Sequence, residues 1–474
     1  MLRPLLPEIL LIVLAIVVLA SDLIWRPGRG LGWLTALGFG VTLVATLLWA
    51  VPAGAPELIF GGMARNDFLA FVFRLLFILA GLVVSILSME TPNLGNKGEY
   101  YTLLIVAVFG MNLMALASDV IMLYLAVETA SLALYLLAGF LRESKSAEAG
   151  FKYFLFGSAA SGVMVYGFSL LYGFTGQTNL YLIGAALGPG QVPVLPLAVV
   201  AILVVVGLGF KVAAVPFHFW APDVYEGAPT PITAFISVAS KAAGFAILAR
   251  LMLAVFPAVQ TYWGSLLMAM AILTMTLGNL LALVQKNIKR LLAYSSIAQA
   301  GYALVGLVVI SPSGLAATIF YLAMYTFTNL ATFGVVIVVT HATHSDEIDS
   351  FAGLSRRSPG LALALLVGFL SLAGIPPLAG FMGKFFIFAA AVEQGRLGTT
   401  LAIIGVLNSI VGLYYYLNVV KVAYLYRSEQ EHEPLPIAGG AAAAVIACLA
   451  GIVALGVWAA PWLDWATQAA KNLF

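Results

Sequence analysis

Residues 359–391 read PGLALALLVGFLSLAGIPPLAGFMGKFFIFAAA. This run is apolar almost throughout, and as one continuous helix about 31 of its residues would measure roughly 46 Å, which is too long for a bilayer without tilt or a break. Its middle segment, residues 374–380 (GIPPLAG), carries two prolines, which remove backbone donors and stop a helix. We therefore expect a membrane-spanning helix that is interrupted in the middle, with Lys384 shortly after the break.

The rest of the chain has the composition of a membrane protein. Of its 474 residues, 62% are apolar and 9% are charged, whereas a soluble domain carries roughly 25% charged residues. A water-soluble globular protein is therefore excluded. The net charge of +2 argues against nucleic acid as a partner. The one cysteine, Cys448, lies in an apolar run, which excludes a disulfide framework and any four-cysteine zinc or iron–sulfur site in this sequence.

The sequence contains fourteen apolar runs that are long enough to cross a membrane. A helix needs about 20 apolar residues to span roughly 30 Å of hydrocarbon, and a β-barrel would show short alternating segments instead. The first run has Glu8 near its start and no small-residue cleavage site behind it, so we expect a retained span rather than a signal peptide. The predicted fold class is an all-α polytopic membrane protein. The runs lie near residues 5–24, 31–51, 67–88, 100–117, 119–141, 151–173, 196–218, 229–254, 262–284, 289–310, 314–340, 359–391, 399–423 and 437–460.

The placement of lysine and arginine predicts the side of the membrane on which each loop lies. Loops after odd-numbered runs hold thirteen of these residues, and loops after even-numbered runs hold three. We therefore expect the odd-numbered loops on the cytoplasmic side and both termini outside. The thirteen are Arg26, Arg29, Lys97, Arg142, Lys145, Lys152, Lys286, Lys289, Arg290, Arg356, Arg357, Lys421 and Arg427, and the three are Arg65, Arg250 and Arg396.

A second interruption falls in the seventh run, where residues 210–216 read FKVAAVP. The stretches 100–254 and 262–421 contain five runs each, and the interrupted run is the fourth in both. Because five is odd, two such repeats in sequence lie upside down relative to each other, and paired interruptions of this kind mark an ion or substrate path at mid-membrane. For either break alone, a plain packing kink is the alternative. We divide the chain into three N-terminal transmembrane helices (1–99), a first five-helix repeat (100–254), a second five-helix repeat (255–428) and a C-terminal transmembrane helix (429–474).

Four ionisable side chains lie inside the predicted spans: Glu128 in the fifth, Lys211 before the break of the seventh, Lys241 in the eighth and Lys384 after the break of the twelfth. A charge at the bilayer centre costs at least ~2.5–3.5 kcal/mol on insertion scales, so each needs a reason. A desolvated amine loses part of its preference for the charged form, and a nearby carboxylate restores it. A lysine whose carboxylate partner approaches and withdraws can therefore take up and release a proton, and this set suits a proton relay.

Two structural explanations of these buried charges are alternatives to a proton relay. Glu128 and Lys211 could form a static buried salt bridge, but Lys241 and Lys384 would then have no second or third buried acid available. For Lys384, the alternative is a side chain that snorkels to the interface from an overlong span.

The four histidines are less informative. His218 follows Lys211 by seven residues and could exchange protons between lysines or lie in an interfacial aromatic belt. We expect His341 and His344 in a solvated cytoplasmic loop and His432 at the surface, and their spacing does not suit a metal site. The sequence shows no phosphate loop, Ser/His/Asp set or dinucleotide fingerprint, so we expect no redox centre and no cofactor in this chain.

Two stretches resemble a known family, the N subunits of the proton-pumping NADH:quinone oxidoreductase (respiratory complex I), which are antiporter-like membrane subunits. Residues 209–231 read GFKVAAVPFHFWAPDVYEGAPTP and lead to Lys241, and residues 371–381 read SLAGIPPLAGF and lead to Lys384. The resemblance covers nearly the whole chain. The sister M type carries an acid where Lys384 stands. The same repeat occurs in multi-subunit cation/proton antiporters, which is the closest competing assignment.

The resemblance implies both a site and partners. It assigns proton transfer to Glu128, Lys211, Lys241 and Lys384, with quinone chemistry in neighbouring subunits as the driving force. It also implies a hetero-oligomer with other membrane subunits in a bacterial cell membrane, in which partner subunits hold NADH, FMN, iron–sulfur clusters and quinone. Two rivals remain: a subunit of a multi-subunit cation/proton antiporter, and a scaffold whose buried charges only fix helix packing.

Overall fold

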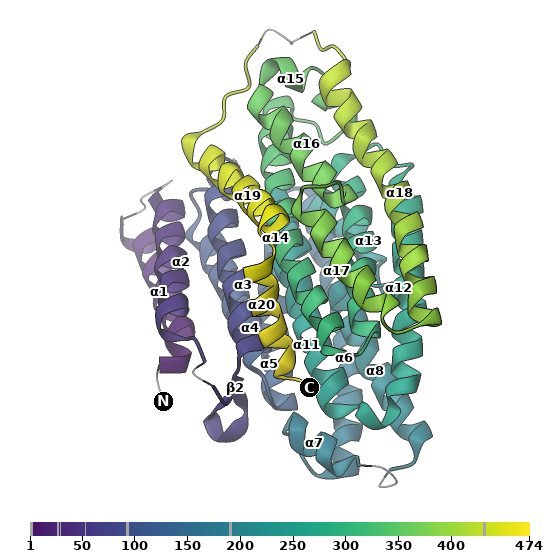
Figure 1. The fold of residues 1–474 in the computed structure, drawn as a ribbon. Coiled ribbons are helices and arrows are strands. Elements are labelled where there is room, and N and C mark those ends of the chain that lie inside the picture. The colour runs from purple at the N-terminus through teal and green to yellow at the C-terminus, as the bar shows by residue number, and fades with distance from the viewer. Residues whose placement is uncertain are drawn as a thin grey trace.

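The computed structural model describes residues 3–25, 28, 30–52, 54–91, 94–188, 192–429 and 433–474. Its elements are α1 (Leu6–Trp25), α2 (Gly30–Trp49), β1 (Glu57–Ile59), β2 (Ala64–Asn66), α3 (Phe68–Ser88), α4 (Gly98–Leu116), α5 (Val120–Ala138), α6 (Ser144–Thr175), α7 (Leu180–Ala186), α8 (Val194–Val212), α9 (Trp220–Gly227), α10 (Thr230–Phe235), α11 (Lys241–Val255), α12 (Gln260–Ala282), α13 (Ile288–Val308), α14 (Pro312–Thr343), α15 (Leu354–Arg357), α16 (Pro359–Ala373), α17 (Ala379–Val392), α18 (Arg396–Leu425), α19 (Gly439–Val457) and α20 (Ala460–Lys471). The long helices stand side by side, with α1 and α2 at one edge and α12 and α18 at the other (Figure 1). Both chain ends lie toward the end of the bundle opposite α15.

The predicted helical membrane fold is confirmed. In the described residues, thirteen helices are long and apolar enough to cross a membrane. Helices α16 and α17 together occupy the predicted twelfth run, so all fourteen runs are helical. The most enclosed span is Thr230–Val255, which consists of α10, a π-helical turn at Ile236–Ser240 and α11. The inverted relation of the two repeats stays a prediction.

Both predicted interruptions are present. Helix α8 ends at Val212, and Ala213 turns the chain with a φ of 55°. Helix α16 ends at Ala373, and Gly374 turns the chain with a φ of 90°, a conformation that glycine adopts without steric cost. The last carbonyl groups of α8 and α16 therefore end inside the bundle and need partners other than a following helical turn.

The last span differs from its prediction. The run near 437–460 forms α19 and then, beyond a kink at Trp458, continues as α20 to Lys471, and both helices pack along α14. Beside the kink, Gly456 lies directly against the break between α16 and α17. A Cβ atom at position 456 would come within 2.2 Å of the Pro377 carbonyl oxygen. The C-terminal span therefore packs directly against the break of the second interrupted helix.

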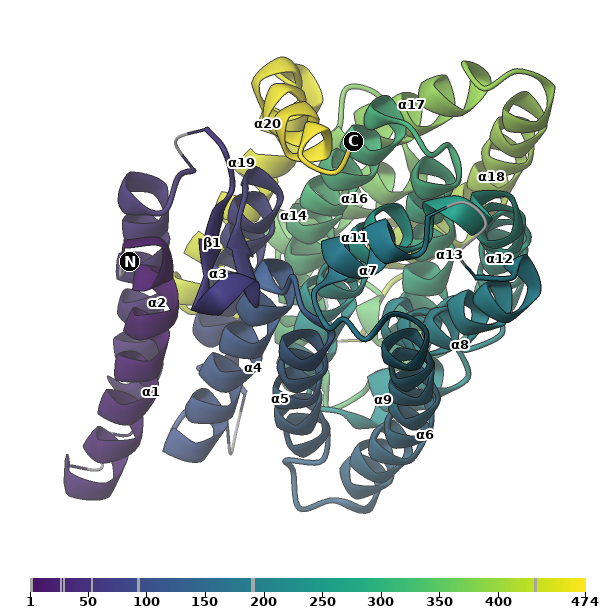
Figure 2. The ribbon, with the colours of Figure 1, turned by 90° about the horizontal axis from the view of Figure 1, so that it is seen from below.

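Two short elements were not predicted. Strands β1 and β2 form an antiparallel hairpin, with Glu57 opposite Asn66, and α7 is a two-turn helix that packs against α11. Seen from below, both lie on the end of the bundle that carries the chain ends (Figure 2). The hairpin packs on the ends of α3 and α4, and α7 packs on α11.

Arg250 is not the loop residue that the count of basic residues assumed. It lies in α11 with 2% of its surface exposed, and its guanidinium donates hydrogen bonds of 2.7 and 2.9 Å to the carboxylate of Asp67. Asp67 also caps α3 by accepting from the N–H of Ala70. Burial alone would raise the pKa of Asp67, but the charge and hydrogen bonds of Arg250, with help from Ala70 and Arg65, hold it below its ordinary value.

A second buried ion pair was missed in the sequence. Arg74 of α3 is fully buried and pairs with Glu8 of α1 at 3.2 Å. Its guanidinium also donates to Asn66 Oδ1 and to the carbonyl of Pro4, each at 3.0 Å. These contacts fasten α1 to α3, and the pair of Asp67 with Arg250 fastens the start of α3 to α11.

We expect Arg250→Gln to destabilise the protein by about 3–5 kcal/mol, because it leaves the carboxylate of Asp67 buried without its main charged partner. The measurement is the midpoint of thermal inactivation, together with the amount of chain retained in membranes. Arg65→Gln is the matched control, since it removes the more exposed partner of the same carboxylate and should cost about 1 kcal/mol or less. Equal losses of stability in the two variants would show that Arg250 is not the main charged partner of Asp67.

The same pair predicts a pH dependence. Because the pKa of Asp67 is lowered in the folded protein, the stabilisation by Arg250 is complete above the ordinary aspartate pKa and disappears as the pH falls through the lowered value. The difference in thermal midpoint between parent and Arg250→Gln should therefore shrink on acidification. If the difference in thermal midpoint grows as the pH falls, the pair of Asp67 and Arg250 is not the origin of the pH dependence.

Candidate functional site

Lys241 lies at the centre of the molecule. It is the first residue of α11, directly after the π-helical turn, an irregularity that is frequent at functional sites. Its Nζ donates to the backbone carbonyl of Ser296 at 2.8 Å, and the Tyr225 ring lies 6.0 Å away. The Tyr225 hydroxyl hydrogen-bonds to Ser296 Oγ at 3.2 Å. The amine therefore faces a neutral oxygen and an aromatic ring rather than a carboxylate.

The expected pair of Glu128 and Lys211 is open in this structure. Lys211, in the last turn of α8, donates to Ser131 Oγ at 2.8 Å, and Glu128 accepts a hydrogen bond from the hydroxyl of Ser161 on α6. Ser131 lies one turn after Glu128 on α5, so the amine reaches the helix of the carboxylate without touching the carboxylate itself. The charge of Glu128 still acts on Lys211. Each of the two ionisable groups thus has a serine hydroxyl as its hydrogen-bond partner.

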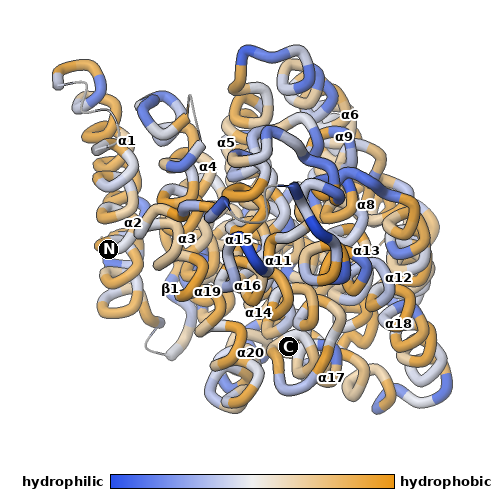
Figure 3. The backbone as a smooth tube through the Cα atoms, turned by 90° about the horizontal axis from the view of Figure 1, so that it is seen from above, coloured by the Kyte–Doolittle hydropathy of each residue, from blue (hydrophilic) through white to orange (hydrophobic). Residues whose placement is uncertain are grey.

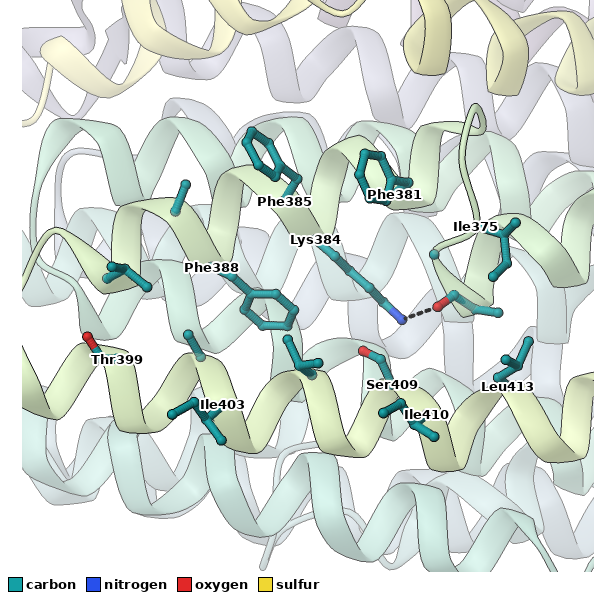
Figure 4. A pocket seen from close by; sticks show the side chains of 16 residues that line it. Ile375, Phe381, Lys384, Phe385, Phe388, Thr399, Ile403, Ser409, Ile410 and Leu413 are labelled. Carbon is teal, nitrogen blue, oxygen red and sulfur yellow. Dashed lines mark hydrogen bonds between the residues drawn. The ribbon is translucent and has the colours of Figure 1, made fainter.

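Lys384 lies at the break of the second interrupted helix. From the second turn of α17, its Nζ reaches back to the carbonyl oxygens of Leu372 and Ala373, the last two residues of α16, at 3.0 Å each. A cation at a helix C-terminus is favoured by the helix dipole, and the ring of Tyr302 lies 4.6 Å from the amine. The side chain is 6% exposed and points inward (Figure 4), so it does not snorkel to the interface.

The same amine borders a cavity of about 760 Å³ between α17 and α18 (Figure 4). Most of the lining side chains are apolar, and the polar exceptions include Ser409 and Thr399. The apolar members include Ile375, Phe381, Phe385, Phe388, Ile403 and Ile410. The amine therefore lies between a carbonyl-lined break on one side and an apolar space on the other.

Helix α13 carries the polar groups that connect Lys241 with Lys384. Ser296 accepts from Lys241, and one turn further along, Gln299 Nε2 donates to the Leu372 carbonyl at 3.1 Å. This is the carbonyl that Lys384 contacts. The amide of Gln299 also accepts a hydrogen bond from the hydroxyl of Tyr321. One face of α13 thus joins the two lysines through side-chain and backbone polar atoms.

The ionisable residues were predicted from the sequence, but the neutral residues that contact them were not. Ser131, Ser161, Ser296 and Gln299 make the contacts described above. A usable signal was present, because Ser296 and Gln299 are polar residues three apart inside an apolar run, which places them on one face of a helix.

The histidines of the described residues differ in their burial. His218, between α8 and α9, is 5% exposed, its Nδ1 has no hydrogen-bond partner among the described residues, and it lies within electrostatic range of Lys241. The side chain of His218 is therefore buried, whereas the adjacent Phe219 is exposed. His341 and His344 are exposed at the end of α14, as expected. His432 lies outside the described residues.

Comparison with known proteins identifies the family. The model of the family described as NADH:quinone oxidoreductase/Mrp antiporter, TM, matches residues 117–412. A protein from Dehalococcoides mccartyi named NADH-quinone oxidoreductase subunit N is 44% identical over 446 residues, which cover 90% of each chain. A protein of the same name from Trichlorobacter lovleyi is 41% identical over 479 residues, which cover 99% of this chain and 97% of that one.

Solved structures agree with this match. A chain of respiratory complex I from Thermus thermophilus with bound aureothin has a TM-score of 0.81 and 35% identity, covering 97% of this chain and 98% of that chain. A chain of the Mrp complex from Dietzia sp. has a TM-score of 0.86 at 22% identity, covering 100% and 98%, and shows the fold alone. Fold and family match together define an antiporter-like membrane protein. The chain belongs to the NADH-quinone oxidoreductase subunit N family.

Gly374→Ala should lower the NADH:quinone reductase activity of membranes by about tenfold or more, because it displaces Lys384 from the two carbonyls. The new Cβ would lie 2.9 Å from Lys384 Cδ. Gly176→Ala is the matched control: Gly176 also ends a helix with a positive φ, of 63°, but a Cβ there meets nothing within 4 Å. Both variants carry the same kind of backbone strain of about 1–2 kcal/mol, so similar activities would refute the role of the Lys384 contact.

Proposed function

We propose that this chain is a proton-translocating membrane subunit of NADH-quinone oxidoreductase, which couples quinone reduction in partner subunits to proton transfer through Glu128, Lys211, Lys241 and Lys384. The observation that carries the proposal is that three lysines are buried in the spans with neutral oxygen atoms as hydrogen-bond partners. In the part of the chain that the structure describes, none of the three has a carboxylate within 4.0 Å, whereas Lys145, Lys152 and Lys289 do. Such amines can change protonation without breaking an ion pair.

Glu128 and Lys211 act as the switch of the relay. In the open arrangement, Ser131 and Ser161 hold the amine and the carboxylate apart. Closure of the pair favours the charged amine, and separation favours its neutral form. Opening therefore releases a proton from Lys211 toward Lys241. The charge of Lys241 also acts on His218, which we propose as a further participant.

Lys241 is the central relay and Lys384 the terminal donor or acceptor toward the exterior side. Ser296 and Gln299 on α13 lie between them and offer a carbonyl, a hydroxyl and an amide. Hydroxyl groups pass protons by accepting one and donating another. Positive charge arriving at Lys241 also disfavours a second charge at Lys384, which promotes release there.

The energy for transport comes from the partners. Each proton moved against 100 mV needs roughly 2.3 kcal/mol for the electrical part alone. In the proposed complex, NADH, FMN, iron–sulfur clusters and quinone belong to partner subunits, and we propose that this chain carries no cofactor. Among the described residues, no group of three or more His, Cys, Asp or Glu side chains could hold a metal ion. The partners are the other membrane subunits of the hetero-oligomer.

The orientation follows from the basic residues. We place the chain in the bacterial cell membrane with the α15 end in the cytoplasm and both termini outside, because the loops at the α15 end carry most of the lysine and arginine. Seen from above, hydrophilic segments gather on this end near α6, α9 and α13 (Figure 3). We also propose that 100–254 and 255–428 are the two inverted repeats, flanked by 1–99 and by the C-terminal span within 429–474.

A second candidate is a subunit of a multi-subunit cation/proton antiporter, which the shared fold with the Mrp complex favours. It predicts transport that depends on sodium and not on NADH oxidation. If proton uptake by membranes stops when NADH oxidation is stopped, and does not change when sodium is added or removed, the result supports the subunit of NADH-quinone oxidoreductase. Flavin and iron–sulfur chains that co-purify with this one support it as well.

Lys211→Ala should leave an assembled complex in which NADH-driven proton uptake falls at least about tenfold, because the switch has lost its proton carrier. The measurement is proton uptake per NADH oxidised in membrane vesicles, with the subunits of the purified complex compared with the parent. Lys421→Ala, on the exposed face of α18, is the control and should behave as the parent. If Lys211→Ala assembles and pumps at the normal ratio, the site assignment is wrong, and if the complex does not assemble, the scaffold interpretation gains support.

A further inference from the structure

Helix α8 ends inside the bundle, directly after the lysine of the proposed switch. Lys211 lies in its last turn, and the chain turns away at Ala213. The carbonyl oxygen of Phe210 accepts a hydrogen bond from the N–H of Ala213 at 3.0 Å. A carbonyl oxygen has two lone pairs, so it can accept a second hydrogen bond. Within a bilayer, the donor of that second bond has to come from the protein itself.

Trp220, the first residue of α9, supplies the second donor. Its indole Nε1 donates to the carbonyl of Phe210 at 3.1 Å, and the side chain is 1% exposed. The rings of Trp220 and Phe210 also pack together, with centroids 5.1 Å apart. A buried indole N–H usually finds a hydrogen-bond partner. Trp220 therefore holds the end of α8 from the other side of the break.

This hydrogen bond fixes the backbone of Lys211 because of the geometry of the peptide bond. The C=O group of Phe210 and the N–H and Cα of Lys211 belong to one planar unit. When the indole orients the carbonyl, it also orients the backbone from which the Lys211 side chain starts. From there, Nζ reaches Ser131 Oγ on α5 at 2.8 Å, one turn after Glu128. A rotation of the planar unit would move the amine relative to both α5 side chains.

Helix α9 is itself anchored, so it can serve as a fixed point. The ring of Trp220 stacks on Tyr153 of α6, with centroids 4.5 Å apart and an interplanar angle of 11°. One turn further along α9, Asp223 pairs at 2.7 Å with Lys152, the neighbour of Tyr153. Asp223 also pairs with Arg290 of α13 at 2.8 Å. A ring stack and two ion pairs thus join α9 to α6 and α13.

The aromatic contacts continue to the helix of the carboxylate. Tyr153 makes an edge-on contact with Tyr135, with ring centroids 4.8 Å apart. Tyr135 lies one turn after Ser131 on α5, the helix that also carries Glu128. Helices α5, α6 and α9 are therefore connected through aromatic rings, and Trp220 attaches the end of α8 to the same set.

The second interrupted helix is closed in a similar way. Trp220 follows Phe210 by 10 residues and Lys384 follows Leu372 by 12, and each donates across its break to a carbonyl in the last turn of the preceding helix. The donor is an amine in the second break and an indole in the first. Because an indole is a donor only and does not titrate, the first break stays closed whatever the charge on Lys211.

We propose that Trp220 is the positioning residue of the switch. Through the carbonyl of Phe210, it holds the backbone of Lys211 at a fixed place relative to α5. Lys211 then exchanges Ser131 for Glu128 by movement of its side chain alone. The proposal rests on the proposed function, and it gives Trp220 no proton to carry, since the indole acts only through Lys211.

The first test uses the assembled complex in membrane vesicles. Trp220→Phe keeps an aromatic ring and removes the N–H group that holds the end of α8. NADH-driven proton uptake should fall about tenfold, because a proton-transfer group that is displaced by about 1 Å loses much of its rate. Uptake by Trp220→Phe at the parental rate would overturn the proposal.

Trp263→Phe is the matched control. Trp263 is 2% exposed and donates through Nε1 to the carbonyl of Phe256 at 2.9 Å, directly after the end of α11. The substitution therefore removes the same kind of buried hydrogen bond at a helix end. Phe256 lies roughly 22 Å along the helix from Lys241, so Trp263→Phe should pump as the parent does. Equal losses of uptake in the two variants would contradict a special role for Trp220.

An isosteric side chain separates the hydrogen bond from the packing, and it covers the case in which Trp220→Phe does not assemble. Benzothienylalanine, inserted at position 220 by codon suppression, has the shape of tryptophan with sulfur in place of N–H. Uptake should be about tenfold lower than in the complex that receives tryptophan by the same route. If the two complexes pump equally, Trp220 only fills space and the proposal is wrong.

Hydrogen exchange tests the hold on α8 directly. The amides of Ala213 and Ala214 bond back to the carbonyls of Phe210 and Gly209 at 3.0 and 2.9 Å. In the assembled complex, these amides should exchange about tenfold faster with benzothienylalanine than with tryptophan at position 220, because the end of α8 opens more often. Unchanged exchange would show that the indole does not hold this end.

Lys211→Ala separates failure of the positioning role from failure of the function. If Lys211→Ala stops pumping while the benzothienylalanine complex pumps normally, the relay stands and Trp220 does not position it. If Lys211→Ala itself pumps normally, the proposed function is wrong, and the role of Trp220 in the switch is wrong with it.

Discussion

The donation of buried amines to backbone carbonyl oxygens is the interaction on which the rest of this structure depends. Inside a bilayer, a polar group must find its partner within the protein. The break after α16 leaves the carbonyls of Leu372 and Ala373 without a following turn, and Lys384 supplies the donor. Lys241 uses the same kind of acceptor at Ser296. These carbonyls give each of the two amines a neutral hydrogen-bond partner, and Lys384 in turn gives the carbonyls at the end of α16 a donor.

Much of the fold was predictable, because a membrane imposes length and hydropathy on every span. The prolines and glycines of the sequence predicted the two breaks at residues 213 and 374. The high cost of a charge in an apolar run singled out four residues as candidates for function: Glu128, Lys211, Lys241 and Lys384. The structure places all four in the spans as expected. In the structure, Lys211 and Glu128 hydrogen-bond to Ser131 and Ser161 rather than to each other. These serine contacts were not predicted, because they depend on side-chain rotamers and on neutral neighbours from other helices.

What the sequence could not show are contacts between residues far apart in the chain. Arg250 lies near the end of its run and looked like a loop residue until its partner Asp67, 183 positions away, was placed beside it. Gln299 looked like one polar residue in an apolar helix, and only the fold shows that it shares a carbonyl with Lys384. The π-helical turn before Lys241 arises from packing at the centre of the bundle, where local propensity has little influence.

The contact of Gly456 with the carbonyl of Pro377 has a mechanical consequence. Helix α19 lies on the periphery, with large apolar side chains such as Ile446, Val453 and Val457 exposed toward lipid. Its tilt therefore responds to the thickness of the surrounding hydrocarbon layer. Gly456 contacts Pro377 in the break that follows Ala373. A change in bilayer thickness that tilts this helix would therefore act on the break next to the carbonyls that Lys384 contacts. In the proposed relay, lipid composition would thus affect the step at Lys384.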